Sequence, residues 1–298
     1  IIAPAVDAQG RRKRFSLFKS KKKPYRYELI GSLGATNFLG DLGGADYTGT
    51  QGLKDIELAL TRPSASISIR YQIVDRFTIK NNLIWGIVKG SDEFTKEAFR
   101  NNRNIHFRSS IFELSTQIEF NFMEMQKGHA YKIKSVRGVK HKDRRIYLFV
   151  GGGLFYFNPK AQYNGKWHAL QPLGTEGQGI IPGKKKYSRV NELIAVGGGM
   201  SFAVDRYWSV GFELSMRKTF TDYIDDVSTN YATQTLIASG ADPMAVYFAD
   251  PSQGKGARPE SVCEGCQRGD PKDKDAYMFA MLTVGYKILT KRRSRSKF

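Results

Sequence analysis

The feature that most constrains the fold lies in residues 190–217, where two runs of alternating side chains meet at Asp205-Arg206. In the first run Ile194 and Val196 share an apolar face, and small residues occupy the other face. A period of two residues predicts strands, and the short link predicts a hairpin. Each run can cross a bilayer as a tilted strand, which needs about 9–11 residues. The hairpin fits a soluble sandwich as well as a membrane barrel, so the rest of the chain has to decide.

The same alternation recurs along the chain, and a second hairpin turns at Asp75-Arg76. A phase change at the start of the fourth strand indicates a bulge near Ile111, and residues 93–99 have a short helical pattern. The predicted fold is all-β, an eight-stranded antiparallel transmembrane β-barrel over residues 25–289. Besides the hairpin at 190–217, the strands are expected at 25–38, 66–73, 77–87, 107–123, 146–157 and 276–288.

The connections between these strands are sorted by length. Links after the second and sixth strands are tight, whereas those after the first, third, fifth and seventh are long. This sorting is typical of an outer-membrane barrel with short periplasmic turns, long extracellular loops and periplasmic termini. A soluble sandwich has no reason to sort its loops in this way. Aromatic residues that would form an interfacial girdle stand at strand ends: Tyr25, Tyr27, Phe122, Tyr207 and Trp208.

The net charge is +19, from 47 Lys and Arg against 28 acids. Such a charge is compatible with nucleic acid, an anionic membrane surface or an acidic partner. The basic residues lie mostly outside the alternating runs, in an arm at 1–24, in the connection 124–145 and in a tail at 290–298. We therefore expect a protein partner beneath the membrane and no nucleic acid. The candidate contact residues are Arg11, Arg12, Lys13, Arg14, Lys21, Lys22, Lys23, Lys132, Lys134, Arg137, Lys140, Lys142, Arg292 and Arg293.

Charged residues also occur within the strands, on the face opposite the apolar one. Because eight strands enclose only enough room for side chains, we expect an ion-pair network that plugs the lumen, with an open pore as the alternative. A triple glycine at 151–153 indicates close approach inside a narrow barrel. The predicted inward set is Arg26, Glu28, Arg70, Lys80, Glu113, Glu119, Glu192, Glu213, Arg217 and Lys287.

An acidic motif follows the seventh strand, within residues 217–228. Its carboxylates could cap a helix, pair with Arg217 or ligate a hard cation such as calcium. The oxygen count is short for calcium, so we expect a structural role and no metal. The motif residues are Arg217, Asp222, Tyr223, Asp225 and Asp226.

The two cysteines, Cys263 and Cys266, have CxxC spacing in the longest loop. Such a pair can be redox-active, half of a zinc site or a disulfide. Without a thioredoxin-like context or a second ligand pair, a local disulfide is expected. Of the four histidines, His106 lies near Ser109 and Glu113, but at no spacing that suggests a nucleophile and its base. We expect no enzyme activity, no cofactor and no small-molecule substrate.

Two motifs resemble the PorG-type outer-membrane protein family of Bacteroidota. They are R-K-T-F-T-D-Y-I-D-D-V-S at 217–228 and Y-E-L-I-G-S-L-G-A-T-N-F-L-G-D-L at 27–42. The resemblance implies a small outer-membrane barrel of the type IX secretion and gliding machinery. It also implies association with a periplasmic ring made of a lipoprotein and its partner ring subunit. No catalytic residue carries over, and the CxxC loop and the basic ends have no match in the family.

Overall fold

The computed structural model describes residues 25–42, 58–94, 98–123, 144–252 and 262–289. Within them, alternating apolar and polar residues form eight long strands, as the sequence predicts, and most boundaries shift by only a few residues. These strands are β1 (Tyr25–Leu39), β2 (Arg62–Gln72), β3 (Phe77–Ser91), β4 (His106–Met123), β5 (Arg144–Tyr156), β8 (Val190–Ala203), β9 (Trp208–Thr219) and β10 (Ala276–Leu289).

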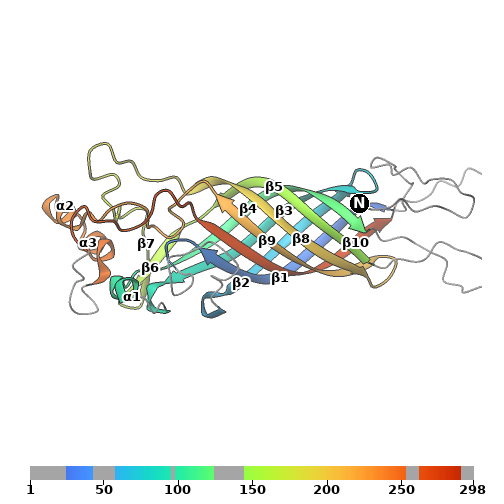
Figure 1. Cartoon of the computed structure of the whole chain (residues 1–298), viewed down its shortest axis with the longest axis horizontal. Helices are drawn as coiled ribbons and strands as arrows, with labels where there is room; N and C mark the ends of the chain where they lie inside the picture. The colour runs from blue at the N-terminus through green and yellow to red at the C-terminus, as the bar shows by residue number, and fades with distance from the viewer. Residues whose placement is uncertain (1–24, 43–57, 95–97, 124–143, 253–261, 290–298) are drawn as a thin grey trace, which may run out of the picture.

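The eight strands close into an antiparallel barrel (Figure 1). Neighbours along the chain pair from β1 to β5, β5 pairs with β8, and β8 pairs through β9 to β10. The last strand then pairs with the first over nearly its whole length, with Leu33 opposite Leu282. Every backbone edge among these eight strands therefore has a partner, and the predicted eight-stranded barrel is confirmed.

The outer wall of the barrel is apolar and uncovered. Leu33 is 71% exposed, Leu282 68% and Leu114 64%. Trp208 and Phe212, which a sandwich would bury, are 46% and 47% exposed. Apolar patches of this extent are rare on soluble monomers. The sandwich alternative is therefore wrong, and the apolar face points outward as a barrel in lipid requires.

One end of the barrel holds the tight turns at 73–76 and 204–207 and a group of outward aromatic rings. Tyr27 packs on Tyr71 with ring centroids 5.0 Å apart, and Trp208 packs on Tyr286 at 5.1 Å. Phe122 is 54% exposed at the same end. The predicted aromatic girdle is confirmed for the residues whose side chains are described.

The other end holds the long loops and additional structure (Figure 1). The connection after β5, residues 158–189, which the sequence predicts to be a long link, contains a hairpin that pairs with β4. Its turn is Asn164-Gly165, with φ angles of 47° and 77°, and Asn-Gly favours such a turn. The helix expected at 93–99 begins later. The added elements are η2 (Leu58–Leu60), η3 (Asp92–Phe94), α1 (Ala98–Arg103), β6 (Pro159–Tyr163), β7 (Lys166–Ala169), α2 (Thr233–Ala238) and α3 (Pro243–Ala249).

The bulge predicted near Ile111 is wrong. The pairing of β3 with β4 runs unbroken through Ile111, and the register shift in β4 lies between Asn121 and Met123. The phase change has another cause: Phe107 and Ile111 face the interior in an apolar cluster at the loop end. The lumen is thus polar in its middle and apolar toward the loops.

Among the described residues, no helix has the length and apolar character needed to cross a membrane.

Candidate functional site

Ion pairs and hydrogen bonds fill the middle of the barrel. Arg70 pairs with Glu28 at 2.9 Å and with Glu119 at 2.8 Å, and Arg145 pairs with the same Glu28 at 3.1 Å. All four side chains are at least nine-tenths buried. The Arg70 guanidinium also lies over the ring of Tyr147, 5.1 Å from its centroid. This first group joins strands β1, β2, β4 and β5 across the lumen.

A second group extends the network along the barrel. Lys80 pairs with Glu213 at 2.7 Å, and the Tyr147 hydroxyl donates to Glu213 at 2.8 Å. Arg217 pairs with Glu113 at 3.2 Å. Tyr277 donates to the same carboxylate, at 3.0 Å. Because each of the charges in these two groups pairs with an opposite charge on another strand, the predicted ion-pair plug is confirmed.

Two glycines of β8 make room for the rings of the plug. A Cβ at Gly199 would lie 2.5 Å from the hydroxyl of Tyr147, and one at Gly197 would lie 2.7 Å from the ring of Phe149. Any larger residue there would displace an aromatic ring from the lumen. The glycines therefore leave the space that the large side chains facing them occupy.

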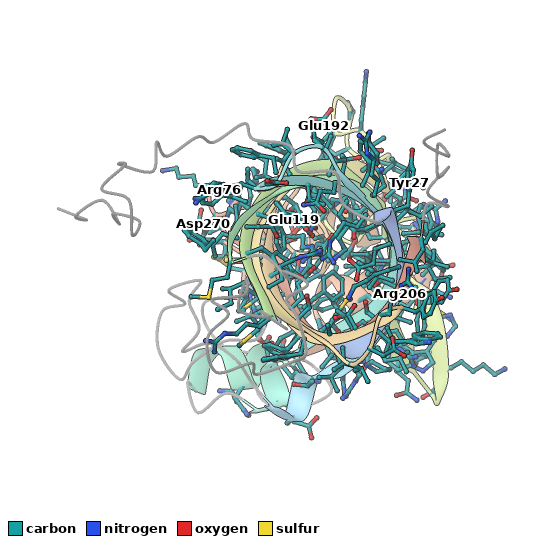
Figure 2. The ribbon with its side chains drawn as sticks, turned by 90° about the vertical axis from the view of Figure 1, so that its right-hand side faces the viewer. Tyr27, Arg76, Glu119, Glu192, Arg206 and Asp270 are labelled. Carbon is teal, nitrogen blue, oxygen red and sulfur yellow. A yellow bond between two sulfur atoms is a disulfide. The ribbon has the colours of Figure 1, made fainter. Side chains whose placement is uncertain are left out.

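Two members of the predicted inward set are wrong. Arg26 and Glu192 are exposed, and Figure 2 shows Glu192 outside the ring of strands and Glu119 inside it. Glu192 shares its strand face with Ile194, which is 46% exposed, because residues two apart point the same way. Arg26 stands at the start of β1, where the wall ends. The other eight predicted residues are buried.

At the loop end of the barrel, beyond the ion-pair network that forms the plug, the four long connections pack together into a cap. Two buried arginines, Arg103 and Arg268, lie at its centre. Arg103 donates to both carboxylate oxygens of Asp92, at 2.7 and 2.9 Å. It also donates to the backbone carbonyls of Arg268 at 2.8 Å and Asp41 at 3.2 Å. The three partners lie in three different connections between strands, so one guanidinium fastens these loops together.

Arg268 is the second of these arginines. Its guanidinium donates to Glu176 at 3.0 Å and to the carbonyl of Asp226 at 2.5 Å. Glu176 in turn accepts from the Ser228 amide at 2.9 Å and the Thr229 hydroxyl at 2.6 Å. The β9–β10 loop is thereby fixed to the β5–β8 loop, and with Arg103 all four long connections are joined.

The acidic motif lies inside this cap. Asp226 accepts from the hydroxyls of Thr175 at 2.5 Å and Tyr187 at 2.6 Å, and Asp225 accepts from the Val227 amide at 2.9 Å. Asp226 has a φ of 67°, in the left-handed region that Asp tolerates better than most residues. Tyr223 stacks on Tyr187, with ring centroids 4.6 Å apart. The motif is thus built into the cap by hydrogen bonds.

Burial perturbs these carboxyl groups. It raises the pKa of Asp222 to about 7, with a further increase from the neighbouring Asp41. It raises the pKa of Asp41 and of Asp226 to about 6. The pKa of Asp225 is also raised, by burial and then by the charge of Asp275. Part of this cluster is therefore protonated near neutral pH.

Arg217 forms no ion pair with the carboxylates of the acidic motif among the described contacts. It points into the lumen from β9 and pairs with Glu113, so the proposed pairing of Arg217 with the loop carboxylates is wrong. The carboxylates do not cap either described helix of the β9–β10 loop, because α2 and α3 begin beyond the motif. Among the described residues, no group of three or more His, Cys, Asp or Glu side chains is arranged to hold a metal ion.

The cysteine loop also has a place in the cap. Cys263 and Cys266 form a disulfide, and Glu264 between them reaches the start of α2. The Glu264 carboxylate accepts from the amides of Gln234 at 2.9 Å and Thr235 at 3.3 Å. The residue before the helix, Ala232, has no side-chain cap of its own. Glu264 therefore supplies the cap that the helix sequence lacks.

The histidine and serine considered as reactive groups are separated by the barrel wall. Ser109 is fully buried and faces the interior, where its hydroxyl accepts from the Asn158 amide at 2.9 Å. His106 lies three residues away and faces outward, accepting from the Gln162 amide at 3.0 Å. Glu113 is bound to Arg217. These residues do not form a nucleophile with its base.

The candidate basic contact residues, in 11–23, 132–142 and 292–293, lie outside the described residues. The strand ends from which these segments leave are described. Tyr25 begins β1, Met123 and Arg144 flank the middle connection, and Leu289 ends β10. All four positions are at the aromatic end of the barrel, opposite the cap.

A family model described as "Domain of unknown function (DUF6089)" matches residues 15–240, which is most of the chain. The chain belongs to this family. The matched range includes both motifs on which the sequence resemblance rests. Among curated proteins, none matches this DUF6089 chain.

Solved bacterial surface barrels are similar to the DUF6089 chain at a low level. Neisserial surface protein A is 9% identical, with a TM-score of 0.37 and coverage of 88% of this chain and 96% of its own. OprG of Pseudomonas aeruginosa is 9% identical, with a TM-score of 0.39 and coverage of 89% and 98%. Ail of Yersinia pestis, in complex with the heparin analogue sucrose octasulfate, is 10% identical, with a TM-score of 0.36 and coverage of 88% and 99%. Similarities this weak do not bear on function.

The cap arginines of this DUF6089 chain were not found by sequence reasoning. Arg103 and Arg268 stand alone in polar loops, and nothing beside them in the sequence marks them as buried. Asp41 was noticed only as part of a Gly-Asp-Leu motif. Glu264 could have been found from the sequence, because it lies between two cysteines expected to form a disulfide, which would hold its carboxylate in a fixed position. The lumen residues were found because strand alternation separates the two faces.

Proposed function

We propose that this protein is a non-enzymatic outer-membrane barrel that anchors or positions the periplasmic ring complex of the type IX secretion and gliding machinery. In this proposal outer-membrane lipid surrounds the apolar wall, and the cap faces outward. The turns and both termini face the periplasm. The ring lipoprotein and its partner subunit are the protein partners, with no cofactor, nucleic acid or small-molecule substrate.

The observation that carries the proposal is that the most basic segments of the chain are all joined to the same end of the barrel. Segments 1–24, 124–143 and 290–298 hold 19 of the 47 Lys and Arg residues, and only three of the 28 acids. All three leave from the aromatic end. A one-sided charge of this size attracts and orients an acidic partner on that side. The two motifs that resemble the PorG-type family add support for the ring complex as that partner.

The plugged lumen supports a role as an anchor over a role as a channel. Arg70, Lys80 and Arg217 cross the interior to carboxylates on other strands, and aromatic rings fill the space between them. An eight-stranded barrel has no room for a water path beside such side chains. In planar bilayers, we expect the purified protein to give no steady conductance, and regular current steps would favour a small porin.

The experiment for the anchor is affinity purification from detergent-solubilised outer membranes. The wild type is compared with two neutralised variants, Arg292→Gln/Arg293→Gln and Lys132→Gln/Lys134→Gln/Arg137→Gln/Lys140→Gln/Lys142→Gln. The control for the first is Lys185→Gln/Lys272→Gln, which removes two exposed lysines from the loop end. We expect the wild type and the control to recover ring subunits, and at least one neutralised variant to recover several-fold less.

Recovery of the wild-type protein without any ring component contradicts the proposal. So does an undiminished complex when both neutralisations are combined with deletion of residues 9–24. Barrel insertion is checked in each variant by heat-dependent gel migration, so that misfolding is separated from lost contact.

A second candidate is an adhesin-type barrel that acts through its loops. The cap favours it, because Arg103 and Arg268 hold the long connections in one arrangement and α2 presents Ile237 with 60% of its surface exposed. A loop surface fixed in advance loses less entropy on binding. Replacing α2 and α3 by a short linker would abolish surface attachment under this candidate and leave ring recovery unchanged under the first.

A further inference from the structure

A row of cations crosses the outer wall at the loop end. In the register of β3 and β4, Lys89 lies directly opposite Arg108, and in that of β4 and β6, Arg108 lies directly opposite Lys160. All three stand on the outward face. Like charges placed directly opposite each other on neighbouring strands repel and destabilise a sheet. Three in succession therefore need a compensating anion.

The described part of the chain supplies only part of that negative charge. Arg108 and Lys160 are exposed and Lys89 is half-buried, and no ion pair with a described carboxylate involves any of them. Arg62 adds a fourth cation that acts on Lys89, and Glu93 is the acid that partly opposes it. The row therefore keeps an excess of positive charge directed away from the barrel.

The surroundings of the row are those of a membrane boundary. The Arg108 guanidinium lies over the ring of Trp167, 5.8 Å from its centroid, and Trp167 is 40% exposed. Four residues along the same strands, Trp85 and Phe112 face each other on the apolar wall. Four residues of strand span about 13 Å. The cations therefore lie about 13 Å from the Trp85–Phe112 pair in the direction of the loops. This places them at the edge of the apolar surface, at the level expected for lipid headgroups.

An apolar groove begins at that pair of rings. It has a volume of about 710 Å³ and lies on the outer wall, where Gly31 and Ala65 leave a depression between Leu33, Ile67 and Trp85. A Cβ at Gly31 would meet no atom within 4 Å, which shows that the floor of the groove is open. Its volume is enough for an acyl chain, and it lies on the side of the row toward the membrane centre.

We propose that the Lys89–Arg108–Lys160 row binds the phosphate of a lipid headgroup in the outer leaflet, with an acyl chain of that lipid in the groove. This inference rests on the membrane insertion and orientation given in the proposed function. Phosphate fits because Arg and Lys donate several charge-assisted hydrogen bonds to its oxygens. A lipid fits better than a soluble anion because the cations border the apolar wall and the groove continues from them. Bound phosphate removes the repulsion along the row.

The test uses the full chain inserted in phosphatidylcholine nanodiscs, with or without lipid A that carries two phosphates. Arg108→Gln/Lys160→Gln is compared with the control Lys185→Gln/Lys272→Gln, which removes the same charge from exposed positions elsewhere in the loops. Lipid A retained per protein is measured by native mass spectrometry, and thermal unfolding is followed in both lipids. A third arm adds inorganic phosphate to phosphatidylcholine discs.

We expect retention of lipid A to fall about five-fold for each cation removed, and thus about 25-fold for the pair. The Tm should respond with opposite signs in the two lipids. In phosphatidylcholine the variant should unfold at the same or a higher temperature than the wild type, because cross-strand repulsion is relieved. With lipid A, the wild type and the control should gain stability and the variant should not.

Equal retention of lipid A by the variant and the control overturns the inference. Stabilisation by inorganic phosphate alone, equal to that by lipid A, overturns the lipid as the source of the phosphate. Neither result involves the ring complex, so each is distinguishable from failure of the anchor proposal. Failure of the wild type to insert into nanodiscs would instead contradict the membrane barrel.

Discussion

Individual buried charges specify the strand register of this barrel. Arg70 forms ion pairs with two carboxylates from different strands, Glu28 and Glu119, and Glu28 also pairs with Arg145. Buried ion pairs of this kind repay their desolvation only when all partners are present. A change in strand register would move these side chains to the lipid face, so the network specifies one register.

Replacing Arg70 with Met tests this dependence. The substitution leaves Glu119 without its ion-pair partner inside the barrel, and breaking a buried pair in this way costs about 3–5 kcal/mol. We expect the free energy of unfolding, measured by urea titration in lipid vesicles, to fall by that amount. Lys185→Met, at an exposed loop position, should change it by about 0.5 kcal/mol or less. Equal stability of the two variants would mean that the plug does not specify the fold.

The cap should lose stability as pH rises. Burial and the nearby Asp41 raise the pKa of Asp222 to about 7, whereas an unfolded Asp titrates near about 3.9. The folded cap therefore binds more protons than the unfolded cap between these values, so its stability falls from about pH 4 to about pH 7. The raised pKa of Asp226, about 6, acts in the same direction. Lys274 opposes the effect at Asp222, and Arg268 opposes it at Asp226.

Hydrogen exchange of residues 222–228 measures this effect. Protection factors, corrected for intrinsic rates, should be higher at pH 5 than at pH 8 in the wild type. Asp222→Asn should reduce the difference, while amides of β1 and β10 should show none in either protein. A cap that becomes more protected toward pH 8 would contradict the assigned direction of the pKa shifts.

At the level of elements, the strands were predictable and the cap was not. Alternation identified the strands because one face meets an apolar exterior and the other meets the plug. It misled at Ile111, where the lumen itself becomes apolar, and at Glu192, which was assigned against the parity of its own strand. The β6–β7 hairpin carried the Asn164-Gly165 signal, which was overlooked. The Arg103 and Arg268 contacts join loops distant in sequence, and no local pattern encodes them.

Helix α2 depends on a cap supplied from another part of the loop. Replacing Glu264 with Ala removes the acceptor for the amides of Gln234 and Thr235, and a lost helix cap costs about 1 kcal/mol. We expect faster hydrogen exchange in residues 234–238. Cys263→Ser/Cys266→Ser should give a similar local increase because the disulfide positions Glu264. The control, Lys272→Ala in the same loop, should leave this exchange unchanged.

Both Glu264→Ala and the cysteine variant should leave exchange in the barrel strands as it is in the wild type. General loss of protection in β8 or β9 would mean that the cysteine loop supports the whole fold and not the helix alone.

The whole molecule has two different ends. One carries aromatic rings, tight turns and the starting points of the basic segments, and the other carries the cap (Figure 1). The proposed orientation places the cap outside the cell. The position of each end relative to the membrane is therefore the property that the partner and lipid proposals share.

Single cysteines test this orientation in intact cells. Lys185→Cys, in the cap, should react with a membrane-impermeant maleimide, whereas Arg206→Cys, in a tight turn, should react only after the outer membrane is permeabilised. Both positions are exposed. The wild type should not react in either condition, because its described cysteines form a disulfide. The reverse pattern of labelling would invert the barrel and remove the proposed contact with a periplasmic ring.

The seam between β1 and β10 has a consequence for biogenesis. The fourteen residues of β10, Ala276–Leu289, close the cylinder against β1, which begins at Tyr25, so the wall stays incomplete until β10 has been made. A truncated product without β10 would have two unpaired strand edges in the bilayer. The backbone amides and carbonyls of these edges could not form hydrogen bonds there, because the bilayer core holds no water. We therefore expect such a fragment to be unstable in the bilayer, because each unpaired backbone group there costs several kcal/mol.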